Sequence, residues 1–184
     1  AAMILPALAK AKQKAMGTQC MNNLRQLTLG WKMYPDDNGG KLVPNGDETH
    51  QPTSLTDPDG MPGGRLAQWC PGRQDVATQL STANSTSVDI GKAWIKMGLL
   101  YPYVNNVDIY KCPADISSLT TFGSRYPHVR SMSMNTWLGD IAPYANITTV
   151  MSYYKENHLI NPGAASLWVF IDENPSSIND GAFI

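Results

Sequence analysis

Charge is scarce in this sequence, and glutamate is scarcer still. Lys, Arg, Asp and Glu make up 16 % of the 184 residues, and only three of the fifteen acidic residues are Glu. The net charge is -1, so the chain lacks the basic surplus with which a dedicated nucleic-acid binder neutralises phosphates. The small net charge and the 42 % of hydrophobic residues also argue against intrinsic disorder. Because Asp, Asn, Gly, Pro and Ser favour turns, we expect a loop-rich body that contains strands.

Cysteine is also rare. The chain has Cys20, Cys70 and Cys112, and none of them forms a C-x-x-C pair, which excludes a zinc ribbon or a thioredoxin-like motif. Outside the cytosol an odd number of cysteines allows one disulfide and one free thiol, and three buried reduced thiols are the alternative. A bridge from Cys20 to the strand region would close a large loop, worth roughly 4 kcal/mol in the chain-entropy model.

No hydrophobic run approaches the roughly 18 residues of a membrane span. Residues 1–9 are nevertheless almost wholly apolar, they do not begin with Met, and the first charge is Lys10. We interpret this segment as the end of a longer apolar stretch. A helix that is apolar on all sides has to be buried in a membrane or among other copies of itself.

The pattern of residues 1–34 predicts one long helix. Ala, Leu, Lys, Gln and Met dominate it, and Pro35 with the turn residues after it is predicted to end it. At ~1.5 Å per residue the helix is about 50 Å long, so residues 1–14 should protrude from a small domain. Pro6 and Gly17 predict either a tolerated kink or a bend built into the helix. One face carries an apolar stripe expected to pack on the rest of the chain: Met16, Cys20, Leu24, Leu27, Trp31 and Tyr34.

The rest of the sequence shows no internal repeat and no second globular domain. Alternating or continuous apolar runs predict short strands at 41–43, 107–112, 129–138 and 167–171. A short helix or turn that ends at Pro102 is expected within 91–104, and exposed loops at 36–66 and 78–89. We therefore predict an α+β fold, in which a long N-terminal helix (1–35) packs on a small antiparallel sheet with long loops (36–184).

No catalytic constellation is apparent, so we expect a protein that is not an enzyme. The chain has no nucleophile elbow and no phosphate-binding glycine loop. His50, His128 and His158 lie far apart, without metal-ligand spacing. The best cation candidates are Asp172, Glu173 and Asp180, because Ca²⁺ takes six to eight oxygen ligands; a solvated turn is the alternative, and no other cofactor is expected.

Three segments of the helix resemble bacterial type IV pilin-like proteins. Residues 1–15, 19–27 and 33–40 are most similar to the type II secretion G-like pseudopilins, which carry a prepilin-type cleavage and methylation signal. Residues 98–104, 109–115, 130–135 and 169–173 resemble the subgroup associated with an H-X9-DG motif. The family's leader and processing site would precede Ala1, and its H-X9-DG motif would follow Ile184, so we expect both ends to continue.

The resemblance implies a filament subunit. Such subunits are anchored in the inner membrane by the apolar helix, are cleaved by a prepilin peptidase, and are packed helix to helix by an assembly machinery into a filament at the cell surface. Pro6 resembles the proline at which pilin helices bend or melt. The resemblance favours a Cys20–Cys112 disulfide, with Cys70 free or an alternative partner, and by position it supports calcium at the acidic segment. The expected filament interface is formed by Ala1, Met3, Ile4, Leu5, Pro6 and Leu8.

Two alternative functions are consistent with the sequence. The first is a pseudopilin of a type II secretion system, which forms a short periplasmic piston. The second is a membrane-tethered module that binds carbohydrate or another ligand through the loops around Trp69, Trp94 and Trp137. Self-assembly through residues 1–15 separates them, because an untethered binding module should stay monomeric.

Overall fold

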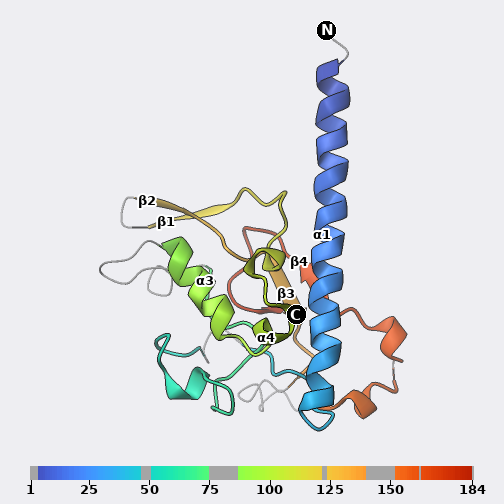
Figure 1. Cartoon of the computed structure of the whole chain (residues 1–184), viewed down its shortest axis with the longest axis vertical. Coiled ribbons are helices and arrows are strands. Elements are labelled where there is room, and N and C mark those ends of the chain that lie inside the picture. The colour runs from blue at the N-terminus through green and yellow to red at the C-terminus, as the bar shows by residue number, and fades with distance from the viewer. Residues whose placement is uncertain are drawn as a thin grey trace.

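The computed structural model describes residues 4–46, 51–74, 87–121, 124–139, 152–161 and 163–183. One long helix, α1 (Ile4–Asp37), stands beside a smaller body that we call the head, formed by the described residues after Asp37 (Figure 1). The first turns of α1 lie well away from the head (Figure 1). A long helix beside small sheets is the α+β fold that the sequence predicts.

The end of α1 at Asp37 lies within the segment from Pro35 to Gly40 that the sequence predicts to end the helix, although the helix continues past the proline itself. Pro35 occupies the last turn, where its ring removes one backbone hydrogen bond without preventing the helical conformation. The stop comes from Gly39 and Gly40, which adopt φ values of 62° and 74°. The amide of Gly40 donates to the carbonyl of Pro35 at 2.8 Å, which satisfies an orphan carbonyl of the last turn.

No bend is visible in α1 at Pro6 or at Gly17 (Figure 1). Pro6 lies in the first turn, where backbone amides have no intrahelical partner in any case. Gly17 lies in the exposed part of the helix, and no atom comes within 4 Å of the place where a Cβ would stand. The helix therefore tolerates both residues.

Two small sheets form the strand part of the head. Strands β1 (Ser118–Thr121) and β2 (Ser124–Pro127) pair antiparallel. The other sheet has the order β4-β3-β5, with β3 (Met132–Asn135) between β4 (Phe170–Asp172) and β5 (Ala182–Phe183). The predicted sheet was wholly antiparallel, and this is wrong for one pair. The chain reverses after β4 and crosses to the far edge of β3, so β5 runs parallel to β3.

Short helices replace two of the predicted features. The expected helix within 91–104 is two helices, α3 (Ser87–Met97) and α4 (Tyr101–Val104), and Pro102 lies in the first turn of α4 instead of ending a helix. The predicted strand at 107–112 is wrong, because η2 (Val107–Tyr110) is a 3₁₀ helix capped by the side chain of Asn106. The other 3₁₀ helices are η1 (Pro58–Gly60), η4 (Glu156–His158) and η5 (Ala164–Ser166).

Two further predictions concern the connecting segments. The expected strand at 41–43 is reduced to one isolated bridge between Lys41 and Lys155. The predicted loop at 36–66 is only partly on the surface, because Leu42 and Val43 are buried in the core. Most of the predicted loop at 78–89 lies outside the described residues, and its last residues belong to α3.

Trp69 lies at the centre of the hydrophobic core. Its ring stacks on Tyr110 at 5.8 Å between centroids and packs against Phe170 of β4 at 5.1 Å. The indole nitrogen is also satisfied, since Nε1 donates to Oδ1 of Asn45 at 3.1 Å and to the carbonyl of Gly181 at 3.0 Å. This one side chain therefore ties together segments that are far apart in the sequence.

Gly30 permits the close approach of α1 to α4. A Cβ at this position would lie 2.6 Å from Cγ1 of Val104, so we expect Gly30→Ala to lower the free energy of unfolding by about 1 kcal/mol through overpacking. Gly17→Ala is the matched control on the same helix. It adds a methyl group in open space and should raise stability by about 0.5–1 kcal/mol through helix propensity.

Urea unfolding of the two variants measures both effects. Adding Val104→Ala to Gly30→Ala should recover most of the loss, because it removes the clashing methyl group. If Gly30→Ala stabilises the chain as much as Gly17→Ala does, the close approach of the two helices is not as described.

Candidate self-assembly site

The first half of α1 is largely exposed in the described structure. From Leu5 to Gln19 every side chain is exposed except the half-buried Met16, and the first buried residue is Cys20. Leu5 and Leu8 are 72 % and 64 % exposed. We call Leu5–Gln19 the free half of α1. An isolated helix of this length is only marginally stable in water, and this segment lacks most of the packing contacts that usually stabilise a helix.

The structure reaches only part of the predicted filament interface. Leu5, Pro6 and Leu8 lie exposed on the free half. Ile4 is the first residue of α1. Ala1 and Met3 lie outside the described residues.

A second apolar stripe, which we call the outward stripe, is exposed on α1, and its last member, Met33, borders a hollow that Met61 and Met97 of the head also line. Met21, Leu29 and Met33 are between 51 % and 61 % exposed. Their spacings of eight and four residues place them on one side of the helix. The sequence reading missed this stripe, although its spacing is as helical as that of the inward one. Single exposed apolar residues need no explanation, but a row of them on one helix face is typical of a packing surface.

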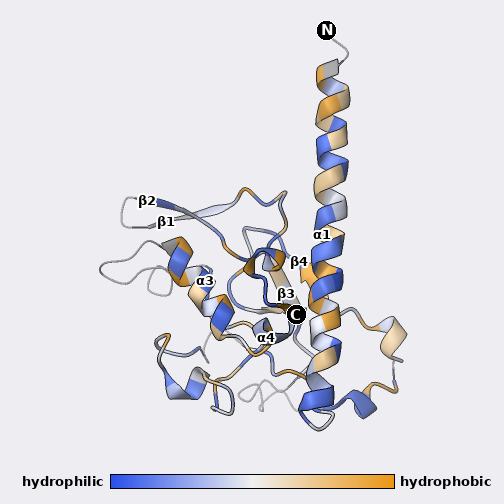
Figure 2. Ribbon diagram, viewed as in Figure 1, coloured by the Kyte–Doolittle hydropathy of each residue, from blue (hydrophilic) through white to orange (hydrophobic). Residues whose placement is uncertain are grey.

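Charge is unevenly divided along the sequence. Residues 1–34 contain five basic residues and no acidic one, whereas residues 35–184 contain nine basic and fifteen acidic residues. Lys10, Lys12 and Lys14 all belong to the free half, where polar and apolar residues mix along the ribbon (Figure 2). The free half is therefore an apolar and basic surface on a chain whose acidic residues all follow residue 34 in the sequence.

The inward stripe of α1 contacts the head from Cys20 onwards. Cys20, Leu27 and Trp31 are buried, and Leu24 and Tyr34 are partly buried against the core. The stripe also contains Asn23, which the sequence reading missed because it is polar. Its side-chain amide is buried and donates to the carbonyl of Lys111 at 2.9 Å.

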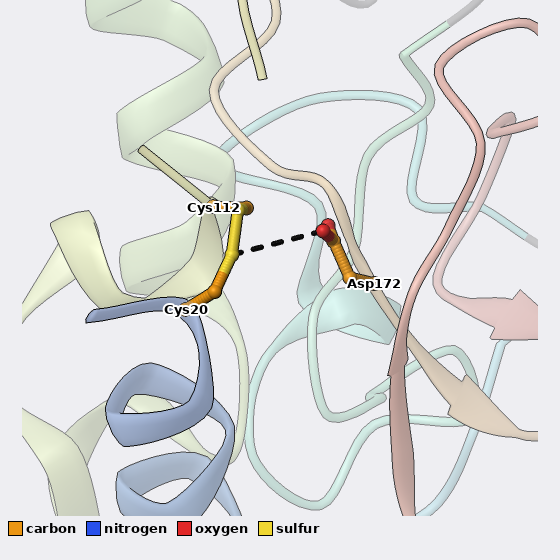
Figure 3. Close-up of side chains that lie close together, drawn as sticks. All are labelled: Cys20, Cys112 and Asp172. Atoms are coloured by element: carbon orange, nitrogen blue, oxygen red, sulfur yellow. Dashed lines mark hydrogen bonds between the residues drawn. A yellow bond between two sulfur atoms is a disulfide. The ribbon is translucent and has the colours of Figure 1, made fainter. Parts of the chain in front are cut away.

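A disulfide between Cys20 and Cys112 joins α1 to the segment after η2, with 4.9 Å between the two Cα atoms (Figure 3). The pairing favoured by the family resemblance is confirmed. Cys70 is the free cysteine; it is fully buried, and burial raises the pKa of its thiol to about 11. At neutral pH that thiol stays protonated and unreactive.

The three predicted calcium ligands do not come together. Asp172 points toward the disulfide (Figure 3), whereas the buried Glu173 accepts hydrogen bonds from Ser133 Oγ at 2.5 Å and Ser177 Oγ at 3.0 Å. Asp180 is buried and accepts from the amide of Ala182 at 2.8 Å. Glu173 and Asp180 thus already serve as acceptors within the chain.

One other group of three metal-binding residue types occurs among the described residues. It consists of Cys20, Cys112 and Asp172, whose ligand atoms lie within 4.8 Å of one another. In the disulfide neither sulfur is a thiolate, and the thiolate is the form of cysteine that binds metals. Only one carboxylate then remains as a donor, so this group does not suit a metal ion.

A buried polar network that the sequence did not indicate supports β3. Arg130 is fully buried, and its guanidinium donates to the carbonyls of Met132 at 2.8 Å and Gly72 at 3.4 Å. The guanidinium also reaches Ser133 Oγ at 3.5 Å, and that hydroxyl donates to Glu173. A buried charge needs such partners, so the network accounts for an arginine and a glutamate inside the head.

The aromatic residues proposed for ligand binding have different surroundings. Trp69 and Trp94 are buried, which removes them from any ligand surface, while Trp137 is 46 % exposed.

The three histidines do not form a site among the described residues. His128 is buried, burial lowers its pKa, and its Nδ1 lies 3.0 Å from Ser117 Oγ. His158 is exposed, and His50 lies outside the described residues.

Comparisons of this chain with protein-family models, curated proteins and solved structures found no match. Within the described ranges, no helix combines the length and apolar content that a membrane crossing requires.

The disulfide should contribute to stability chiefly as a cross-link. Its cysteines are 92 positions apart, and we expect Cys112→Ala to lower the free energy of unfolding by about 2–4 kcal/mol. The double variant Cys20→Ala/Cys112→Ala should cost little more, because the first substitution already opens the bond. Urea unfolding checks this, and a double variant that costs twice as much would show that side-chain packing dominates.

Proposed function

We propose that this chain is a structural subunit of an extracellular type IV pilus-like filament, assembled through packing of the apolar N-terminal helices. The observation that supports it most is the free half of α1, which extends from the head without a partner. The proposal rests on this geometry together with the family resemblance of the sequence.

Packing against neighbouring helices would give the free half the burial that it lacks. Leu5 and Leu8 are largely exposed in the single chain, and burying one such side chain is worth about 1.5–3 kcal/mol. Packed helices lie about 8–10 Å apart, so each copy could contact several others. The outward stripe of Met21, Leu29 and Met33 would extend the same contact toward the head.

The charge distribution is compatible with self-association. The lysines of the free half would repel one another if only free halves came together. The surplus of acidic residues after residue 34 supplies opposite charge on every copy. A staggered arrangement, in which the helix of one copy runs beside the heads of others, would bring the two signs together.

The proposed partners and location follow from this role. Before assembly the apolar start of the helix would hold the chain in the inner membrane, where a prepilin peptidase and an assembly machinery would act on it. After assembly its partners would be other copies of itself at the cell surface. No enzymatic activity and no nucleic-acid partner belong to the proposal. A pseudopilin of a type II secretion system would use the same helix surface but form a short periplasmic filament.

Apolar contacts of the free half should be required for assembly. We expect Leu5→Arg/Leu8→Arg to abolish fibres, because it places two more charges in the proposed helix bundle. Ile160→Arg is the matched control, since Ile160 is an apolar residue of the head with 79 % exposure. Electron microscopy of material sheared from cells, with mass spectrometry of the fibres, measures the outcome.

Fibres that contain the wild-type chain and the Ile160→Arg control, but not the Leu5→Arg/Leu8→Arg variant, would support the proposal. Short assemblies confined to the envelope fraction, with the same dependence on Leu5 and Leu8, would favour the pseudopilin. Fibres that incorporate the Leu5→Arg/Leu8→Arg variant as well as the wild type would refute assembly through this surface.

A further inference from the structure

A carboxylate stands beside the disulfide that joins α1 to the head. Oδ2 of Asp172 lies 3.7 Å from Sγ of Cys20, the contact drawn as a dashed line in Figure 3. Both sulfurs belong to the disulfide, so neither carries a proton to share with the carboxylate. The cysteines are buried, while Asp172 is exposed at the end of β4. A negative charge is thus held between solvent and a largely buried S–S bond.

The position of this carboxylate is fixed by the fold. Asp172 pairs with Met132 in the β3–β4 register. Ser131 Oγ donates to Asp172 Oδ1 at 2.6 Å and accepts a hydrogen bond from the amide of Cys112 at 2.8 Å. One hydroxyl therefore bridges the carboxylate and the backbone of a bonded cysteine, and Oδ2 is the oxygen that faces the sulfur.

The charges around Asp172 do not neutralise it. Partial burial raises the pKa of Asp172, the hydrogen bond from Ser131 lowers it, and the negative charge of Asp115 raises it further. Lys111, the nearby cation, lies 3.7 Å from Asp115 and also donates to the carbonyl of His128. Within the described part of the chain, no ion pair to Asp172 is present. His128 interacts with the charges of Asp115 and Lys111, and burial lowers the pKa of its imidazole, which keeps it neutral around pH 7.

We propose that Asp172 protects the Cys20–Cys112 disulfide from reduction by anionic thiols. Reduction begins when a thiolate attacks a disulfide sulfur. Attack on Sγ of Cys20 forms a mixed disulfide with the incoming thiol and releases Cys112 as a thiolate. A second thiolate then attacks the mixed disulfide, which releases Cys20 as a thiolate and the two reductant molecules as their own disulfide. The released thiolates take protons from water.

The carboxylate of Asp172 opposes the first step in two ways. It repels the approaching thiolate, and it raises the energy of the negative charge that spreads over the sulfurs during attack. Two like charges about 4 Å apart interact strongly enough, even in a water-like environment, to slow attack by about five- to tenfold. The protection depends on the ionised carboxylate, so it develops as the pH rises through the raised pKa of Asp172.

The test measures reduction of the folded, oxidised chain by thiols of different charge. Glutathione, 2-mercaptoethanol and cysteamine form thiolates that carry about two, one and no net negative charges, respectively, by the ordinary pKa values of their groups. The opening of the bond is followed by alkylation and mass spectrometry of the peptides that contain Cys20 and Cys112. The variants are Asp172→Asn and, as a control for the loss of one acid elsewhere, Glu156→Gln, which is exposed in η4.

We expect Asp172→Asn to speed reduction by glutathione about tenfold per thiolate at low ionic strength, reduction by 2-mercaptoethanol less, and reduction by cysteamine least of the three. Glu156→Gln should leave all three rates unchanged. Equal acceleration by all three thiols would show that the substitution merely loosens the structure, and that result would overturn the proposal. Unchanged rates would overturn it too.

A second measurement needs no variant. In the wild-type chain, the glutathione rate per thiolate should fall relative to the cysteamine rate as the pH rises through the titration of Asp172. A ratio that does not change with pH would contradict electrostatic protection.

Discussion

The structure depends on the attachment of α1 to the head, which begins at Cys20. Cys20 is the first buried residue of the helix, and from there Leu27 and Trp31 fill the core while the disulfide fixes the helix covalently. Upstream of this point, from Leu5 to Gln19, every side chain is exposed except the half-buried Met16. Because the rise is ~1.5 Å per residue, the free half extends about 22 Å beyond the anchor. An apolar and basic helix of this length needs another surface to pack against, and this need is the physical basis of the proposed function.

The anchor is itself held by the interior of the head. Ser131, the residue before β3, and Asp172 of β4 both contact the disulfide region. The pairing of β3 with β4 brings them together, and Ser131 hydrogen-bonds to both Asp172 and the amide of Cys112. The buried Arg130 and Glu173 are linked through Ser133, whose hydroxyl accepts a hydrogen bond from the guanidinium and donates one to the carboxylate. Strands of three or four residues are too short to be stable alone, so the buried polar network and the core around Trp69 supply what the short ladders lack. The helix anchor and the sheet therefore stabilise each other.

The sequence predicted features that depend on local periodicity and failed for those that depend on distant partners. The inward stripe of α1 follows helical spacing, and the α+β class follows from one such helix before a turn-rich chain. The strand predicted at 107–112 from its apolar run is wrong, because the side chain of Asn106 caps a 3₁₀ helix there. Leu42 and Val43 are buried although turn residues surround them in the sequence. Strand β5 pairs parallel to β3 because the chain crosses from β4 to the other edge of β3, and no local sequence pattern indicates that connection.

The candidate site was predictable to a similar degree. An apolar start to a long helix pointed to the free half, and the family resemblance pointed to the cysteine pair that the structure joins. The position of Asp172 beside that pair could not be foreseen, since it depends on the register of β3 and β4 across 40 residues of chain. The burial of Arg130 was likewise hidden, because its partners are mostly backbone carbonyls brought close by the fold.

Amide hydrogen exchange of α1, in the single chain and in assembled material, tests the central claim most directly. If the free half is stabilised by other copies, the amides of residues 5–19 exchange quickly in the single chain and become protected on assembly, while those around Leu27 are protected in both. Protection of residues 5–19 in the single chain, or fast exchange of these residues in the fibre, would contradict the account.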